Sequence, residues 1–298
     1  MSAKSEKKYK LKGHESFYIR DGWLRKGMKN VKAEPGLFGV EDVVDRLAVG
    51  ANMVKAIRFW LQAGHLTVEK IQSGSKRVQK LTSDFGEIII GKDPYFEDIF
   101  TLWIVHYFIA ANNEMCTSWY LFFNKFALTE FSKEELVEGM QQLLEDYIGH
   151  KSFSQGSLKD DCGVILKTYF EEDMMRDPED NLICPLSELG LIKQKKDMRG
   201  KSIYCKTKPS IEKLHPLVIM YGIVRSMEDT NGMSVDLLLE RDNSVGKLFN
   251  LDRAMIYYYL EELKRMGLVE INRTAGLDMI YPAQITSEQV LAMYYDGL

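Results

Sequence analysis

The sequence has no closely spaced cysteine pair, no long apolar run and no apolar leader. Cys116, Cys162, Cys184 and Cys205 are widely and irregularly spaced, which argues against a disulfide framework and a cysteine zinc site. The longest apolar run, 100–111, has 12 residues, whereas a bilayer span needs about 20, so a buried helix is expected there. No hydrophobic stretch follows the lysine-rich start, so no signal peptide is predicted. These absences predict a cytoplasmic protein with reduced thiols and no membrane partner.

Catalytic sequence motifs are also missing. No PD…ExK, HNH, P-loop, GxGxxG or Ser/His/Asp pattern is present. Metal-dependent phosphodiester cleavage needs carboxylates that converge on a cation, and the candidate acids are Asp93, Glu97 and Asp98. The same acids are expected in the first turn of a helix, where they favour its dipole. The sequence therefore predicts no cofactor, with a divalent cation such as Mg²⁺ needed only if the protein is a nuclease.

Positive charge is scarce in the whole chain but concentrated at its front. The net charge is −4, with 45% hydrophobic and 28% charged residues, as in an ordinary globular protein. Residues 1–92 contain 18 Lys and Arg against 10 Asp and Glu, whereas 93–298 contain 21 against 33. Because a local positive field supplies most non-specific DNA affinity, the front of the chain is the candidate nucleic-acid lobe.

Residues 40–63 have the pattern of a helix-turn-helix. One helix is predicted over 40–48, and Gly50 is expected to make the sharp turn because glycine tolerates positive φ. A second helix is predicted over about 52–63, ended by Gly64 as its C′ glycine. The side chains of the first helix expected to face inward are Val43, Val44 and Leu47.

The second helix separates polar from apolar residues. The polar stripe, at spacings of three and four, consists of Asn52, Lys55, Arg58 and Gln62. The opposite face consists of Met53, Ile57, Trp60 and Leu61. A DNA recognition helix needs this division, with one side packed and the other carrying hydrogen-bond donors. The alternative is an ordinary surface helix that happens to carry two cations.

Two short strands are predicted after this helix, at 65–71 and 77–81, around a SGSK turn. A hairpin in this position is typical of the wing of a winged helix. Lys76 and Arg77 at the turn are therefore further candidate DNA contacts.

A similar pattern recurs near the end of the chain. A short helix at 245–249 and a helix at 253–266, ended by Gly267, precede two strands around a turn at 274–276. The core stripe of the longer helix is Ile256, Tyr259, Leu260 and Leu263. Its other side carries the DNA candidates Arg253 and Tyr257, with Lys264, but also Glu261 and Glu262. Those carboxylates would repel phosphates, so a protein-binding or dimerisation module is the equal alternative.

Residues 93–182 are predicted to be a helical core. Asp93 is expected as N-cap and Pro94 as the first residue of a helix that continues through Ala111. Two further helices are expected, at 133–147 with Ser132 as cap and at 157–170 with Ser157 at its start. The acidic stretch 171–180 is expected to be a connection.

The predicted fold is mainly α, a helical body with winged-helix modules at the N- and C-terminal ends. The predicted parts are a flexible basic arm (1–12), an N-terminal winged-helix-like DNA-binding domain (13–92), a helical core (93–182), a basic hairpin segment (183–213) and a C-terminal winged-helix-like domain (214–298).

The segment before the helix-turn-helix combines His14, Glu15 and Arg20 with aromatic residues and shows no core periodicity. A histidine, a carboxylate and an arginine can hold a phosphate or move a proton, so these three are candidate catalytic residues. The alternative is a buried hydrogen-bonded clasp that fixes the N-terminal arm to the body.

Several blocks of the chain are distinctive in sequence: GHESFYIRDGWLRKG, AVGANMVKAIRFWLQAGHL, DPYFEDIFTLWIVHYFIA with SWYLFFNKF, and EDNLICPLSELGLI. Together they resemble one bacterial family encoded in DNA phosphorothioation defence islands. The resemblance extends from about residue 13 to about 282, and Ser16 stands where the family has threonine. It implies a DNA-acting component of single-strand phosphorothioation with nicking endonuclease activity. No family catalytic residue is assigned, although His14, Glu15 and Arg20 match the opening motif.

The sequence therefore predicts a DNA-binding component of a phosphorothioation and phage-defence system that nicks DNA to permit sulfur insertion. The expected partners are DNA, sulfur-transfer proteins and ATPase proteins of the system, and a second copy of the chain. The alternatives are a non-enzymatic winged-helix regulator that represses its own operon as a dimer, and a protein-interaction scaffold.

Overall fold

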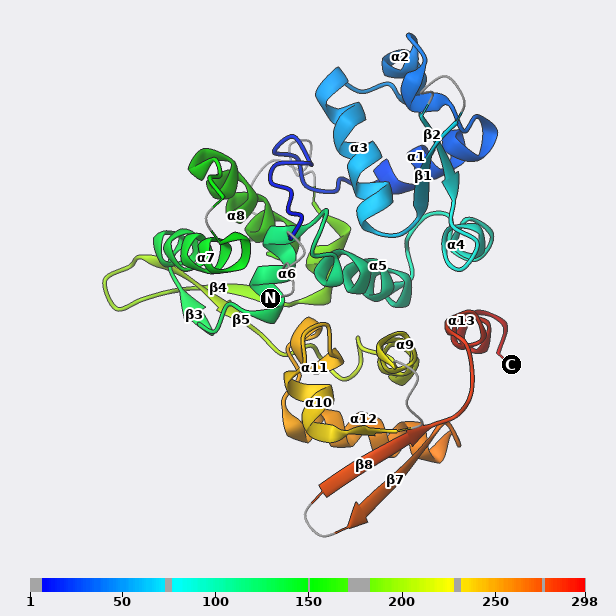
Figure 1. The fold of residues 1–298 in the computed structure, drawn as a ribbon, viewed down its shortest axis with the longest axis vertical. Helices are drawn as coiled ribbons and strands as arrows, with labels where there is room; N and C mark the ends of the chain where they lie inside the picture. Colours follow the sequence, from blue (N-terminus) through cyan, green and yellow to red (C-terminus); the bar gives the residue numbers. More distant parts are fainter. Residues whose placement is uncertain are drawn as a thin grey trace, which may run out of the picture. The chain divides into compact units, whose positions relative to one another are not determined.

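The computed structural model describes residues 7–72, 77–149, 151–170, 183–227, 232–274 and 277–297. It divides into two compact units, Met1–Thr207 and Lys208–Leu298 (Figure 1). The fold is mainly α with small antiparallel sheets, as predicted. The predictions that lie outside the described residues concern the start of the arm (1–6), Lys76 and the rest of the 73–76 turn, the acidic stretch 171–180 and the hairpin tip at 275–276.

The first unit contains most of the helices. Its helices are α1 (Trp23–Ala33), η1 (Leu37–Gly39), α2 (Val43–Leu47), α3 (Ala51–Ala63), α4 (Gly86–Lys92), α5 (Ile99–Ala111), α6 (Thr117–Asn124), α7 (Lys133–Ile148), α8 (Gln155–Tyr169) and η3 (Pro185–Leu189). Its strands are β1 (Thr67–Ile71), β2 (Arg77–Leu81), β3 (Glu130–Phe131), β4 (Ile192–Lys196) and β5 (Ser202–Lys206). β1 and β2 form an antiparallel hairpin, and a second sheet has the order β3-β5-β4. The predicted boundaries at 92/93 and 182/183 fall inside this unit.

α5 lies in the core of the first unit. Every residue from Phe100 to Ala110 is buried, which agrees with the uniformly apolar sequence. His106 within it is paired with the Tyr169 hydroxyl at 2.8 Å. The prediction of a buried helix is confirmed. In the part of the chain that the structure describes, no helix is both long enough and apolar enough to cross a membrane.

The predicted start of α5 at Asp93 is wrong. The N-cap is Asp98, whose side chain accepts the backbone N–H of Phe100. Asp93 instead follows α4, and its carboxylate accepts the N–H groups of Glu97 and Asp98 at 3.1 and 3.2 Å and the Thr101 hydroxyl at 2.6 Å. These bonds hold 93–98 in a compact turn before the helix begins. Two aspartates, Asp93 and Asp98, precede the apolar run, and local capping rules do not distinguish them.

Two helices joined by a short turn, α2 and α3, lie in the region of the predicted helix-turn-helix, but the turn differs from the predicted one. α2 is shorter than expected, and Val44 is 37% exposed rather than facing inward. Ala48, with φ 47°, takes the left-handed position, whereas Gly50 has φ −64°. Gly64 has φ −81°, and the left-handed residue after α3 is His65. Neither predicted position therefore needs glycine for a positive φ, because a neighbour supplies it.

The caps of α7 and α8 illustrate one confirmed and one wrong prediction. Ser132 forms a capping box with Glu135, as the sequence pattern predicts. α8 begins earlier than predicted, because Ser154 is its N-cap and accepts the Ser157 N–H. The basic hairpin is observed as β4 and β5, and β3 adds a strand to it from a distant part of the sequence.

The described part of the basic arm, 7–12, is not free. The Tyr9 hydroxyl donates to the Ser152 carbonyl at 2.9 Å, and the Lys10 N–H donates to the Thr117 hydroxyl at 3.0 Å. The arm is fixed by these long-range hydrogen bonds, which its lysine-rich composition does not indicate.

The second unit is a smaller helical domain with a hairpin. Its elements are α9 (Pro216–Ser226), β6 (Met233–Ser234), α10 (Val235–Glu240), α11 (Val245–Leu248), α12 (Arg253–Arg265), β7 (Val269–Thr274), β8 (Leu277–Pro282) and α13 (Ser287–Asp296). β8 pairs antiparallel with both β6 and β7. The predicted core stripe of α12 is confirmed, because all four of its side chains are fully buried. Gly267, with φ 73°, supplies the left-handed residue after this helix.

The four cysteines are free thiols. Burial raises the pKa of Cys162 and Cys184 to about 12. Both thiols are therefore protonated and weakly nucleophilic near neutral pH.

Two glycines of α4 give a matched stability prediction. A Cβ at Gly86 would meet the Leu66 carbonyl oxygen at 2.1 Å, whereas a Cβ at Gly91 meets nothing within 4 Å. Gly86→Ala is expected to destabilise the first unit by about 1–3 kcal/mol because the backbone must shift. Gly91→Ala is expected to stabilise it by about 0.5–1 kcal/mol, since alanine favours the helix. Urea unfolding of both variants tests this, and equal effects would contradict the packing of α4 on the Leu66 carbonyl.

Candidate nucleic-acid interface and a buried histidine–aspartate clasp

α3 presents its polar stripe outward. Asn52 and Lys55 are exposed, while Arg58 and Gln62 are half-buried. The opposite side packs into the unit, and the Trp60 indole N–H donates to the Phe17 carbonyl at 2.9 Å. The predicted division of this helix is present, and its polar face is accessible to a partner.

The cations of this face have carboxylate neighbours. Lys55 Nζ lies 3.7 Å from Glu15, a weak exposed pair. Arg58 donates to Glu69 Oε2 from Nε at 2.9 Å and from Nη2. Arg77 Nη1 lies 3.5 Å from the other oxygen of the same carboxylate. The two arginines therefore share one acid and keep a net charge of about +1 between α3 and the β1–β2 hairpin.

A cavity of about 330 Å³ lies beside these groups. Its polar lining comes from Arg58, Glu69, Arg77 and Gln79, and its apolar lining includes Pro35 and Phe38. The predicted recognition helix and the predicted wing thus share one cavity with a loop that sequence analysis did not single out.

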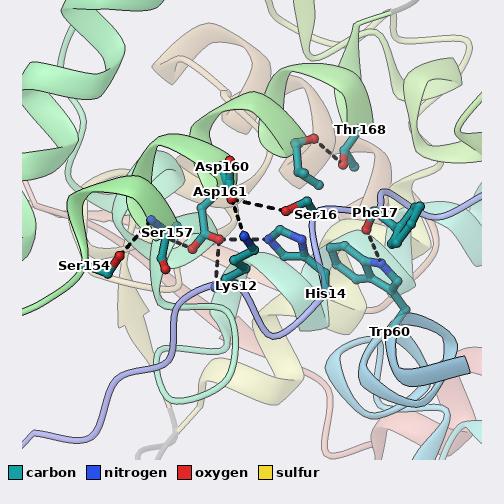
Figure 2. Close-up of polar contacts among 12 residues, drawn as sticks. Lys12, His14, Ser16, Phe17, Trp60, Ser154, Ser157, Asp160, Asp161 and Thr168 are labelled. Carbon is teal, nitrogen blue, oxygen red and sulfur yellow. Dashed lines mark hydrogen bonds and ion pairs between the residues drawn. The ribbon is translucent and has the colours of Figure 1, made fainter. Parts of the chain in front are cut away.

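His14 is part of a buried clasp formed by the side chains of His14, Ser118 and Asp161 together with the backbone N–H of Lys12. His14 Nε2 lies 2.9 Å from Asp161 Oδ1, which also accepts the Lys12 backbone N–H at 2.9 Å (Figure 2). The Ser118 hydroxyl donates to Asp161 Oδ2 at 2.5 Å. The clasp joins the N-terminal segment to α6 and α8, which agrees with the structural alternative considered for this histidine.

The clasp is closed to solvent. The side chains of His14 and Asp161 are 1% and 2% exposed. The His14 ring stacks on Trp60 at 5.7 Å between centroids and meets Trp119 edge-on at 5.3 Å. A phosphate cannot reach a side chain sealed in this way without an opening of the unit.

Glu15 and Arg20 take different partners from His14. Glu15, with φ 50°, faces Lys55, while the Arg20 guanidinium lies 5.4 Å from the Phe17 ring centroid and 5.3 Å from that of Trp23. The three residues of the opening motif therefore do not share one cluster in this structure.

Asp160 forms an outer link beside the clasp. Lys12 Nζ lies 2.7 Å from Asp160 Oδ2, and the Ser16 hydroxyl donates to the same oxygen at 3.2 Å (Figure 2). The hydrogen bond from Lys12 lowers the pKa of Asp160 below its usual value.

This lowered pKa gives a pH prediction. A depressed carboxyl pKa contributes stability above the unfolded value of about 3.9, and the contribution disappears as pH falls through the folded value. The thermal midpoint of Asp160→Asn is expected to lie below that of the parent at pH 6 and to converge with it near pH 2. A difference that stays constant over this range would contradict an ionised Asp160 link.

The proposed acid group around Asp93 does not fit a metal. Both Asp93 oxygens accept hydrogen bonds from the following turn, and Asp98 caps α5. Within the described ranges, no group of three His, Cys, Asp or Glu side chains is placed to hold a metal ion. A divalent cation could bind Asp93 only by displacing the bonds that shape this turn.

The candidate DNA residues of the second unit are also engaged. Arg253 forms an ion pair with Asp236 at 2.5 Å, and the Tyr257 hydroxyl donates to Asp278. The hydrogen bond to Asp278 raises the pKa of Tyr257. Glu261, on the same helix, pairs with Arg273 at 3.1 Å. The α12 surface is therefore of mixed charge.

Sequence reasoning missed three acids that organise these sites. No role was predicted from the sequence for Asp161, Glu69 or Asp84. Strand alternation places Glu69 on the same face as the buried Thr67, which was the available signal for Glu69. Asp84 lies 2.9 Å from His65, a pair that only the fold assembles.

Comparison with known proteins gives one family and two solved structures. The family described as "Protein of unknown function (DUF4007)" matches residues 11–295. A crystal structure of magnesium ion-bound SspB has 26% identity and a TM-score of 0.85, and the match covers 96% of this chain and 88% of that one. A second SspB crystal structure has 25% identity and a TM-score of 0.84, with the same coverage. No curated protein matches the chain.

Proposed function

The chain belongs to the DUF4007 family, and on this premise we propose that it is the DNA-binding component of a bacterial DNA phosphorothioation system. The two SspB structures support this placement, because they match nearly the whole chain and agree with the family resemblance of its sequence blocks. Sulfur-transfer and ATPase proteins of the same system are the proposed partners.

The observation that carries the DNA-binding proposal is the outward polar face of α3 beside the β1–β2 hairpin. Asn52 and Lys55 are exposed on a helix whose other side is packed, as a recognition helix requires. We place α3 in or over the major groove and the hairpin, with Arg77, on the flanking backbone. The arm contributes less than its lysines suggest, because Lys12 already pairs with Asp160 at 2.7 Å.

Nicking is proposed as the activity of this component by family resemblance. The sealed clasp and the occupied Asp93 carboxylate give no reacting group, so we assign no catalytic residue. One similar structure contains magnesium, which makes Mg²⁺ the cation to supply in the assay.

Two measurements test the proposal. Fluorescence anisotropy with a labelled duplex is expected to show affinity falling at least tenfold between 50 and 200 mM salt, which corresponds to roughly two or three neutralised phosphates. Supercoiled plasmid is expected to convert to open circles with Mg²⁺ and not with a chelator. Duplex binding without nicking would favour the repressor alternative, and no binding at low salt would favour a scaffold.

The second unit is proposed to bind a protein instead of DNA. Arg253 and Tyr257 are engaged by carboxylates, and Glu261 adds negative charge to the same helix. Arg253→Ala is therefore expected to leave duplex affinity unchanged within about twofold, the size of effect typical for a charge outside the interface.

A further inference from the structure

The cavity beside Arg58 combines an apolar wall with hydrogen-bonding groups. Its volume of about 330 Å³ falls within the range of about 300–1,000 Å³ usual for small-molecule sites. Phe38 is half-buried, and the 35–39 segment that carries it is fixed to the hairpin because the Gln79 N–H donates to the Pro35 carbonyl at 2.8 Å. The wall is therefore present before any ligand arrives.

The two carboxylate oxygens of Glu69, on the polar side of the cavity, differ in the hydrogen bonds that they already accept. Arg58 occupies Glu69 Oε2 with two N–H groups, whereas among the residues that the structure describes Oε1 has only the long 3.5 Å contact with Arg77. Arg77 is itself 64% exposed and can reorient. Glu69 Oε1 can thus accept a hydrogen bond from a ligand while Arg77 donates to it.

We propose that this cavity binds an unstacked nucleobase of the DNA, and that guanine fits it best. The proposal rests on the DNA binding inferred for α3. Aromatic side chains such as Phe38 stack on the faces of unstacked bases, and enzymes that do chemistry on a base draw it out of the duplex. Guanine presents N–H donors at N1 and N2 on its pairing edge and the acceptors O6 and N7 toward its major-groove edge, which complement a carboxylate and a guanidinium.

The negative charge of Glu69 favours a neutral base over a phosphate in this cavity. A phosphate in the cavity would face the Glu69 carboxylate, which is only 17% exposed and cannot move away easily. A guanine base is neutral and donates hydrogen bonds to that carboxylate. Adenine offers an acceptor at the equivalent ring nitrogen, so it pairs less well with Glu69.

The test uses the full chain and duplexes that carry one central unpaired guanine, adenine or thymine, with a fully paired duplex for reference. Anisotropy is expected to show the unpaired-guanine duplex bound at least fivefold more tightly than the adenine one. Phe38→Ala and Glu69→Gln are expected to reduce this ratio below twofold. Glu87→Gln removes the same charge from an exposed pair with Lys32 outside the cavity, and should keep the ratio. Thermal unfolding verifies that the variants are folded.

Each other outcome overturns the proposal. If the parent binds paired duplex but shows no guanine preference, the cavity assignment is wrong while the DNA-binding proposal stands. A preference that persists in Phe38→Ala and Glu69→Gln places the base elsewhere. Failure to bind any of the four duplexes at low salt overturns both the cavity and the DNA-binding proposals.

Discussion

Replacing Asp161 with alanine should lower the free energy of unfolding of the first unit by about 3–5 kcal/mol, the cost of breaking a buried polar pair. Asp161 accepts hydrogen bonds from the Lys12 N–H and the Ser118 hydroxyl and lies 2.9 Å from His14 Nε2. Without the carboxylate these groups stay buried and unpaired, and each costs about 1–3 kcal/mol if it is not rehydrated. Urea unfolding followed by tryptophan fluorescence measures the loss, because Trp60 and Trp119 surround the clasp.

The neighbouring acid provides the control for this prediction. Asp160 is 39% exposed, so Asp160→Ala should cost less than about 1 kcal/mol. The comparison of these variants distinguishes a structural clasp from a catalytic role for His14. A variant of His14 or Asp161 that keeps the parent's stability and loses plasmid nicking would restore a catalytic role for His14.

Removing both Lys55 and Arg58 should weaken duplex binding by about 2–3 kcal/mol, roughly 30- to 150-fold in Kd. Lys55 is exposed, and its contacts with Glu15 at 3.7 Å and with the Asn52 side-chain oxygen at 3.2 Å lie at the surface, so it is available to a phosphate. Loss of Arg58 leaves the Glu69 carboxylate with Arg77 alone, which adds repulsion toward the DNA to the lost contact. The slope of log affinity against log salt concentration should also become less negative by about one or two.

A matched double variant on α8 tests whether position matters. Lys159 and Lys167 are exposed in the same unit, and Lys159→Ala with Lys167→Ala removes the same formal charge away from α3. This variant should keep duplex affinity within about threefold, since distant surface charges are screened at physiological salt. Equal losses in the two double variants would mean that net charge, not the α3 surface, governs binding.

The elements that the sequence predicted well are those with local causes. The spacing of Asn52 and Lys55 against Trp60 sets the two faces of α3 within a few turns of one helix. Strand alternation around short turns likewise predicted the hairpin β1–β2 and the pair β7–β8. The family resemblance rests on such blocks as well, and the DUF4007 match agrees with it along most of the chain.

Capping and turn details were less predictable, because several residues compete for the same position. Asp93 and Asp98 are both acceptable N-caps in sequence, and the choice depends on where α4 ends. Ala48 took the left-handed position that Gly50 was expected to hold. In each case neighbouring elements selected one of several locally allowed conformations.

The sequence by itself determined the helical character of the chain, the hairpins β1–β2 and β7–β8 and the polar face of α3, because these follow from side chains a few residues apart. Only the tertiary structure decided what His14 and Arg58 do. His14 meets Asp161 across 147 positions of sequence, and Arg58 meets Glu69 only once β1 folds back along α3. Burial and pairing fix whether a charged group can reach a ligand, and both depend on contacts that no local pattern contains.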